Sequence, residues 1–169
     1  DDSLDVVLCH WALTLMDPIA PVLSEVRRVL SVGGKFAALV DGPMNDAPGY
    51  SDVHDLIYSY VQDKLPSYGE FDLGDPRIRS TNSLKNLASE AFPDATIKVE
   101  SNVVSMEGPI AEVTKTAAGF FYASFMLPPE IHNTMLSKLS NLLSITKQKE
   151  ELGNQGRFIM PISRIVINN

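Results

Sequence analysis

The sequence predicts an α/β domain that opens with a strand–helix–strand unit whose two strands are parallel. Two short runs, residues 5–9 and 35–40, are apolar except for their first residues, Asp5 and Lys35, and do not alternate with polar residues. Unbroken apolarity is typical of strands that are buried on both faces of a parallel sheet. The segment between the runs has helical periodicity. A chain of 169 residues, 44% of them hydrophobic, is long enough to fold around one core.

The helix between these strands is expected to start at Asp17-Pro18 and to stop at Gly33-Gly34. Aspartate is a favoured N-cap, proline suits the first helical position, and glycine supplies the left-handed conformation in which helices commonly end. The apolar positions recur at helical spacing, at Ile19, Val22, Leu23, Val26, Val29 and Leu30. A parallel pair joined by such a helix has a right-handed crossover.

The remaining sequence predicts further helices and strands separated by Gly and Pro breaks. They are a helix over 50–65, a loop over 66–78, a helix capped by Ser80 to Ser83 and ended by Phe92, a strand over 95–105, helices over about 110–126 and 129–152, a turn over 153–156 and a last strand over 158–167. We interpret the chain as one domain, with residues 1–49 on the cofactor side and residues 50–169 as a helical substrate cover plus a terminal strand pair.

Composition excludes several classes of partner. Fourteen Lys and Arg against twenty-one Asp and Glu give a net charge of −7, which argues against binding to a nucleic-acid backbone. The longest clean apolar run, residues 36–40, is too short for a membrane span, and the acidic start does not resemble a secretory signal. A single cysteine excludes an intramolecular disulfide and a cysteine-built zinc site, and it favours a cytoplasmic location.

Two places in the sequence are candidates for a binding site. In an open α/β sheet, ligands bind beyond the carboxyl ends of the strands. This rule selects Cys9-His10-Trp11 after the first strand and residues 41–46 after the second. Both places bring polar or aromatic side chains to the point where an apolar strand meets a loop.

Three motifs in the first half of the chain resemble one enzyme family. They are L-D-V-V-L-C at residues 4–9, D-P at 17–18 and L-S-E-V-R-R-V-L-S-V-G-G at 23–34. Together they are similar to the second half of class I S-adenosylmethionine-dependent methyltransferases, in which a fourth strand of the form (F/L)-D-x-V precedes L-x-E-x-x-R-V-L-K-P-G-G and a fifth strand. Ser31 and Val32 stand where that pattern has Lys and Pro. The later layout is similar to methyltransferases that act on biotin-pathway acyl intermediates or quinones.

The resemblance implies a Rossmann-like sheet of strands four to seven, with the last strand antiparallel, and S-adenosylmethionine as cofactor. It places Cys9, His10 and Trp11 at the cofactor, and Asp41, Asn45 and Tyr50 toward a small-molecule substrate. It identifies no catalytic residue and no metal site. The alternatives are structural: a hydrogen-bonded His10, a packed Trp11, a buried apolar Cys9, a turn at Asp41 to Asp46 and a core tyrosine.

The resemblance also predicts what this sequence lacks. The family binds its cofactor partly through a glycine-rich loop after the first strand, and no G-x-G-x-G occurs in the 169 residues. We therefore expect a carboxyl-terminal part that lacks the first three strands and is inactive by itself. The alternative function is a non-catalytic interaction module that self-associates through an exposed Asp5–Cys9 edge strand. Half of a nicotinamide dehydrogenase is a weaker alternative.

Overall fold

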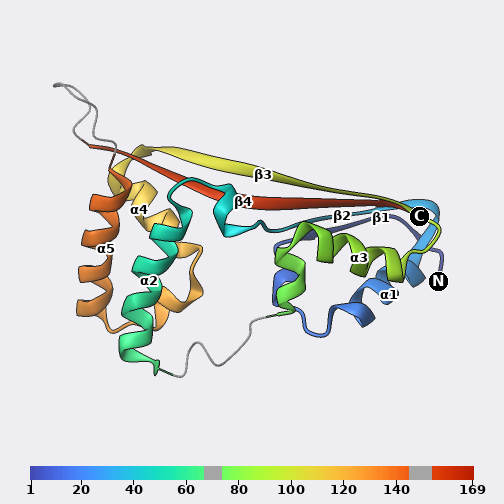
Figure 1. Ribbon diagram of the computed structural model, residues 1–169, viewed down its shortest axis with the longest axis horizontal. Helices are drawn as coiled ribbons and strands as arrows, with labels where there is room; N and C mark the ends of the chain where they lie inside the picture. The colour runs from blue at the N-terminus through green and yellow to red at the C-terminus, as the bar shows by residue number, and fades with distance from the viewer. Residues whose placement is uncertain (67–73, 145–153) are drawn as a thin grey trace. The chain divides into compact units, whose positions relative to one another are not determined.

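The computed structural model describes residues 1–66, 74–144 and 154–169. It confirms an α/β fold with a four-stranded mixed sheet. The helices and strands are β1 (Leu4–His10), α1 (Ile19–Val29), β2 (Leu30–Asp41), α2 (Tyr50–Lys64), α3 (Thr81–Ala91), β3 (Thr96–Pro109), α4 (Ile110–Gly119), α5 (Pro129–Leu143) and β4 (Gln155–Asn168) (Figure 1). Short 3-10 helices are η1 (Leu13–Leu15), η2 (Met44–Asp46), η4 (Pro76–Arg79) and η5 (Tyr122–Met126).

The chain divides into two compact units. The sheet unit comprises Asp1–Asp46, Asp72–Val103 and Pro161–Asn169, and the helical unit comprises Ala47–Phe71 and Val104–Met160. The strands β3 and β4 contribute residues to both units. Each unit is described by itself below.

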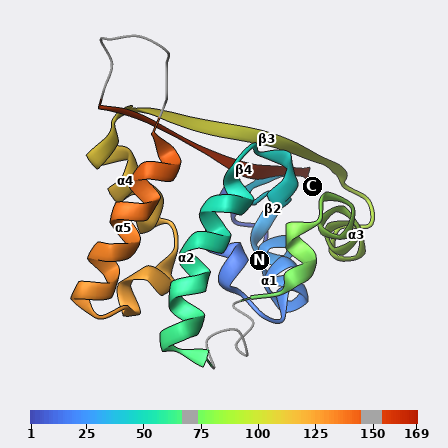
Figure 2. The same ribbon diagram turned by 60° about the vertical axis from the view of Figure 1, so that its left-hand side comes forward.

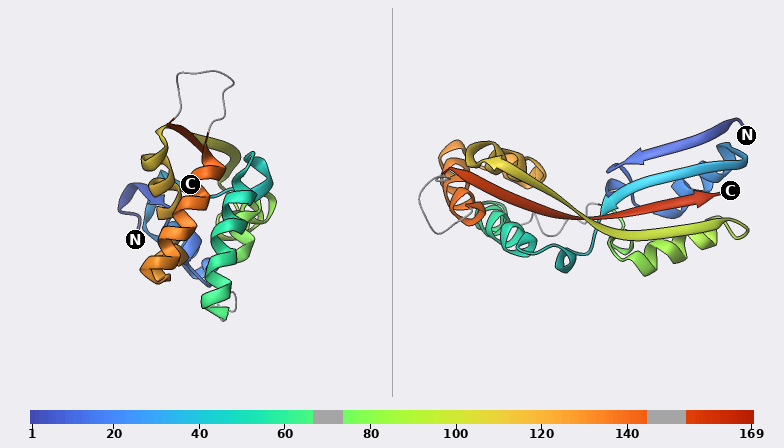
Figure 3. Two further views of the ribbon diagram at one scale, coloured as in Figure 1. Left: turned by 90° about the vertical axis from the view of Figure 1, so that its left-hand side faces the viewer. Right: turned by 90° about the horizontal axis from the view of Figure 1, so that it is seen from above.

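The strands of the sheet unit lie in the order β1-β2-β4-β3 (Figure 3). The pairing of β1 with β2 is parallel, with Val7 opposite Phe36 and Cys9 opposite Ala38. The pairing of β2 with β4 is antiparallel, with Phe36 opposite Ile167. The predicted parallel pair and the predicted antiparallel last strand are therefore both confirmed. The strands β2 and β4 are each hydrogen-bonded on both sides, and β2 carries the parallel pair with β1 as well as the antiparallel pair with β4.

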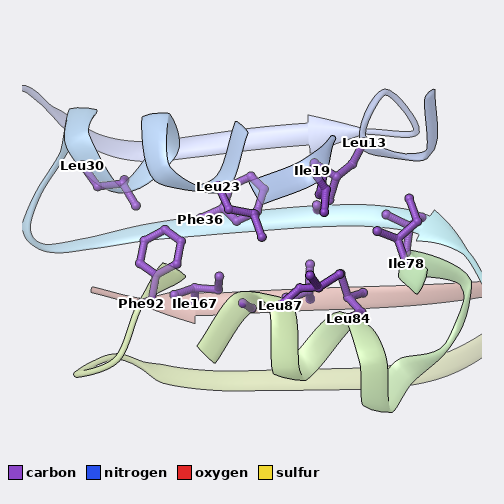
Figure 4. Packing of buried hydrophobic residues seen from close by; sticks show 14 residues of the cluster. Leu13, Ile19, Leu23, Leu30, Phe36, Ile78, Leu84, Leu87, Phe92 and Ile167 are labelled. Atoms are coloured by element: carbon purple, nitrogen blue, oxygen red, sulfur yellow. The ribbon is translucent and has the colours of Figure 1, made fainter. Parts of the chain in front are cut away.

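The helices α1 and α3 pack side by side on one face of this sheet (Figure 1). Strand residues Phe36, Val40 and Ile165 face these helices and are fully buried. Figure 4 shows how the residues of this core interlock between the helices and the strands; they include Leu13, Ile19, Leu23, Leu30, Ile78, Leu84, Leu87, Phe92 and Ile167. Burial of these apolar side chains is the main source of stability for the sheet unit.

The strand β1 is less buried than its sequence predicts. It lies at the edge of the sheet, and only Val7 and Cys9 pack against the core. Leu4, Val6 and Leu8 are 45%, 55% and 75% exposed. Side chains alternate between the two faces of a strand, so Leu4, Val6 and Leu8 lie on the face that α1 and α3 do not cover.

The predicted limits of several helices are also wrong. The helix α1 begins at Ile19 without a side-chain cap, so Asp17 is not its N-cap, and it ends at Val29, before the two glycines. Gly33 has the expected left-handed conformation, with φ of +79°, but it lies within β2. Gly34 brings the backbone close to β1, because an added Cβ would lie 3.2 Å from the Leu4 carbonyl oxygen. These residues form an irregularity in the β1–β2 ladder, whose register shifts between Leu4 and Val6.

In the helical unit, α2, α4 and α5 lie side by side (Figure 2). Their buried faces include Val53, Ile57, Val61, Val113, Ala117, Met135 and Leu139. The predicted helix over 110–126 ends at Gly119, a residue of low helix propensity, and a 3-10 helix follows. The predicted helix over 129–152 ends at Leu143, and Ser144 instead forms an isolated antiparallel bridge with Gly156. Residues 145–152 lie outside the described ranges, as does part of the predicted loop at 66–78. No described helix has the length and apolarity needed to span a membrane.

A matched pair of leucines tests this assignment of the core. Leu23 on α1 is fully buried, whereas Leu142 on α5 is 45% exposed. We expect Leu23→Ala to lower the free energy of unfolding by about 3 kcal/mol, because it removes buried methyl groups and leaves a cavity. Leu142→Ala should change it by less than about 1 kcal/mol. Urea denaturation measures both; equal losses would contradict the packing described here.

Candidate functional site

Trp11 lies directly beyond the carboxyl end of β1. Its backbone N–H donates to the Leu39 carbonyl at 3.0 Å, which continues the hydrogen-bond ladder between β1 and β2 for one more residue. The backbone then turns, because Trp11 has a φ of +56°. A left-handed conformation is uncommon for a residue other than glycine and often marks a functional position. The turn sends the indole ring toward the end of β2.

Asp41 ends β2 and contacts Trp11 directly. The Trp11 indole Nε1–H donates to Asp41 Oδ1 at 2.8 Å, and both side chains are half-buried. The imidazole of His10, which is exposed, lies edge-on to the indole with ring centroids 4.8 Å apart. The two places that the sequence selected are therefore adjacent. An aromatic ring and a carboxylate lie together at the carboxyl edge of a parallel strand pair.

The other candidate residues have different surroundings. Cys9 is half-buried and packs against the core of the sheet unit, which agrees with its reading as a small apolar residue. Asn45 is exposed on η2. Tyr50 belongs to the helical unit, where its ring lies 5.8 Å from that of Phe121 and 6.1 Å from that of Phe158.

The two histidines of the helical unit have different surroundings. His54 stacks on Tyr58 with ring centroids 4.3 Å apart, and its Nδ1 lies 3.0 Å from the exposed carboxylate of Asp55. His132 lines a cavity of about 260 Å³ with Ser124, Phe125, Leu127, Pro129 and Asn133. Among the described residues, no three His, Cys, Asp or Glu side chains are placed to hold a metal ion together.

A second segment supports the turn at Trp11, and the sequence analysis missed it. The backbone N–H of Asp75 donates to the Met16 carbonyl at 3.0 Å, so residues 74–75 lie against the loop that follows Trp11. Asp75 is 4% exposed, and it accepts hydrogen bonds from the backbone and the guanidinium of Arg77. The Arg77 guanidinium lowers the pKa of the Asp75 carboxyl below its ordinary value. The sequence contained a signal for a helix start here, since Asp75-Pro76 is an N-cap followed by proline at the first helical position.

Comparisons with known proteins match the first part of the chain to one family model. Residues 1–38 match the family model described as a methyltransferase domain. The mitochondrial 2-methoxy-6-polyprenyl-1,4-benzoquinol methylase of Mus musculus is 39% identical over 75 residues, which cover 44% of this chain and 22% of that protein. The chain therefore matches less than a quarter of the length of this relative.

Solved structures can be aligned with nearly the whole chain. The YcgJ protein from Bacillus subtilis is 13% identical, with a TM-score of 0.51 over 100% of this chain and 65% of that one, which indicates a shared fold. A Haemonchus contortus phosphoethanolamine N-methyltransferase 2, solved with phosphomonomethylethanolamine and S-adenosylhomocysteine, is 14% identical over 99% of this chain and 34% of that chain, with a TM-score of 0.47.

The predicted resemblance to class I S-adenosylmethionine-dependent methyltransferases is thereby confirmed. Residues 1–38, which carry the methyltransferase-domain pattern, include β1, the turn at Trp11, α1 and most of β2. S-adenosylmethionine is the cofactor of that class.

The contact between Trp11 and Asp41 can be tested by fluorescence, because Trp11 is the one tryptophan of the sequence. Asp41→Ala removes the acceptor of the indole N–H. It should change the emission maximum and the acrylamide quenching of Trp11, and it should lower the free energy of unfolding by about 1 to 2 kcal/mol. Asp41→Asn keeps an acceptor oxygen, so its emission maximum, quenching and free energy of unfolding should be closer to those of the wild type. Asp46→Ala, at an exposed position of η2, is the control. Unchanged emission in Asp41→Ala would contradict the contact.

Proposed function

We propose that this chain forms one side of the active site of an S-adenosylmethionine-dependent methyltransferase that acts on a small molecule. The observation that carries the proposal is the Trp11–Asp41 pair at the carboxyl edge of β1 and β2, next to a segment that matches a methyltransferase domain. Ligands of open α/β sheets bind at this edge.

The groups at this edge fit a sulfonium cofactor. A sulfonium is a cation, and an aromatic face and a carboxylate are the side-chain groups that attract one. Trp11 and Asp41 supply both, and His10 supplies an exposed hydrogen-bonding group beside them. Cys9 immediately precedes His10 on β1, so its backbone is part of the same strand end.

The chemistry that the cofactor supplies when bound is an electrophilic methyl group. The contribution that we assign to the chain is alignment. Trp11 limits where a ligand can lie beyond β1, and Asp41 holds the indole in place while adding negative charge. Methyl transfer to a good nucleophile depends mainly on proximity and orientation. An indole ring held in one position therefore contributes to alignment even without a general base.

The acceptor that we propose is a small molecule, and a substituted quinol is the first to test. The supporting observation is the 39% identity over 75 residues to a mouse benzoquinol methylase. Asn45 and Tyr50 remain our candidates for substrate contacts, since both follow the end of β2 in the chain.

Calorimetric titration with S-adenosylhomocysteine tests this proposal. The protein expressed from the complete reading frame that encodes this sequence should bind the ligand. Trp11→Phe and Asp41→Ala should each weaken binding by on the order of tenfold, because each removes part of the wall at the cofactor. A matching assay follows S-adenosylhomocysteine release from S-adenosylmethionine with a benzoquinol acceptor.

His132→Ala is the control for this titration, since His132 lies in the helical unit away from β1 and β2 in the chain. Equal affinities for the wild type, Trp11→Phe and Asp41→Ala would refute a donor site at this edge. Retained affinity without any methyl transfer to quinols would refute only the choice of acceptor.

A second candidate function, self-association through β1, has its own supporting observation. The strand lies at the edge of the described sheet and exposes Leu4, Val6 and Leu8. An apolar edge strand is a template for pairing with another chain. A second copy offers the same apolar surface, so two edges would be self-complementary.

Sedimentation of the 169-residue chain tests this candidate. We expect a dimer that Val6→Lys converts to a monomer, because a charge on an edge strand blocks edge-to-edge pairing. Val32→Lys, at a position 95% exposed within β2, adds the same charge elsewhere and should leave the dimer intact. A wild-type chain that sediments as a monomer would exclude this function.

A further inference from the structure

The conformation of Trp11 depends on the loop that follows it, to which neither the sequence motifs nor the proposed function gives a role. Residues 12–16 leave β1 through η1, with Leu13 buried in the core at 1% exposure. Because Trp11 has a φ of +56°, its backbone is in a conformation that a bulky residue adopts only when its surroundings hold it there. The contacts of this loop therefore decide where the indole lies.

The first of these contacts is a hydrogen bond from Thr14. The Thr14 hydroxyl donates to the Trp11 carbonyl at 2.7 Å and closes the turn from its far side. Thr14 is only 5% exposed, so water does not readily replace this bond. With Leu13 anchored in the core, the hydroxyl has a fixed position from which to hold the Trp11 peptide.

The second contact is the close approach of Gly74 to the same loop. A Cβ added at Gly74 would lie 2.0 Å from the Thr14 carbonyl oxygen and 2.7 Å from its carbonyl carbon. Both are backbone atoms, so no side chain can rotate away to make room. Gly74 also has a φ of +78°, which favours glycine. A larger residue at position 74 must therefore displace the Thr14 backbone or move away from it.

The third contact fixes the segment that carries Gly74. The Asp75 backbone N–H donates to the Met16 carbonyl, and the buried Asp75 carboxylate accepts from the Arg77 backbone N–H at 3.0 Å and from its guanidinium at 2.6 Å. Ile78, at 1% exposure, anchors η4 in the core of the sheet unit. Residues 74–78 therefore form a fixed support for the loop.

We propose that Thr14 and Gly74 are positioning residues of the donor site. Thr14 holds the Trp11 carbonyl, and Gly74 allows the 74–75 segment to lie directly on the Thr14 backbone. Together they keep Trp11 in the left-handed conformation that directs its indole N–H to Asp41. This inference rests on the proposed function for its consequence in ligand binding, whereas the positioning itself concerns the chain alone.

Two pairs of variants test the proposal with matched controls. Gly74→Ala adds a methyl group against the Thr14 backbone. Gly33→Ala introduces a side chain at an equally positive φ, +79°, where nothing lies within 4 Å, so it carries the backbone strain without the contact. Thr14→Val removes the hydroxyl that holds Trp11. Thr114→Val makes the same change at a threonine that is also 5% exposed and whose hydroxyl has no partner among the described residues.

The first measurement is Trp11 fluorescence without ligand. Gly74→Ala and Thr14→Val should change the emission maximum and the acrylamide quenching of this one tryptophan, whereas Gly33→Ala and Thr114→Val should leave both unchanged. Circular dichroism and melting temperatures establish that each variant is folded. Thr14→Val keeps the β-branched shape of the side chain and removes only the hydroxyl's hydrogen bond, so it tests the inference even where Gly74→Ala does not fold.

The second measurement is calorimetric affinity for S-adenosylhomocysteine in the protein expressed from the complete reading frame. Gly74→Ala and Thr14→Val should weaken binding on the order of tenfold, as expected when a contact residue loses its support. The two controls should bind like the wild type.

The outcomes separate this inference from the proposed function. Unchanged emission in the folded Thr14→Val variant overturns the positioning role. Changed emission with wild-type affinity overturns the assignment to the donor site, provided that Trp11→Phe itself weakens binding. Wild-type affinity in Trp11→Phe overturns the donor site proposed at Trp11, and the fluorescence result still decides whether Thr14 and Gly74 position the indole.

Discussion

The parallel pairing of β1 with β2 is the constraint on which the rest of the sheet unit depends. It places the carboxyl ends of both strands at the same edge, so residues 30 positions apart in sequence, Trp11 and Asp41, form a hydrogen bond. It also requires a crossover, and α1 provides it while burying Ile19 and Leu23 against the sheet. The antiparallel pairing of β4 on the other side of β2 then completes the buried face.

The sequence predicted these features because each follows from a local pattern. Apolar runs located β1 and β2, helical periodicity located α1, and the rule on strand ends selected both members of the Trp11–Asp41 pair. The conformation of Trp11 could not be predicted in this way. It depends on Gly74 and Asp75, which are distant in sequence, and no local pattern at Trp11 contains their contacts.

The two Asp-Pro pairs illustrate why the same local pattern predicts a helix start correctly at one position and wrongly at another. Both have the composition of a helix start. At Asp75-Pro76 the carboxylate accepts from the Arg77 backbone N–H and η4 follows, whereas at Asp17-Pro18 the helix begins one residue after the proline without a side-chain cap. The burial of β1 was mispredicted for a related reason. A nearly unbroken apolar run does not show whether a strand has neighbours on both sides. In the described sheet, β1 lies at the edge.

The irregularity between β1 and β2 has a consequence for how this sequence can change in length. The register passes from Leu4 opposite Leu30 to Val6 opposite Lys35, so residues 31–34 lie outside regular pairing. An insertion or deletion there alters a turn and leaves the facing of the strand intact. One residue deleted within 36–40 would instead turn the strand residues on one side of the deletion to the opposite face of the sheet, because side chains alternate. Insertions and deletions in related sequences should therefore concentrate before Lys35. Such changes leave the regular pairing after Lys35 intact, and with it the distance in space between Trp11 and Asp41.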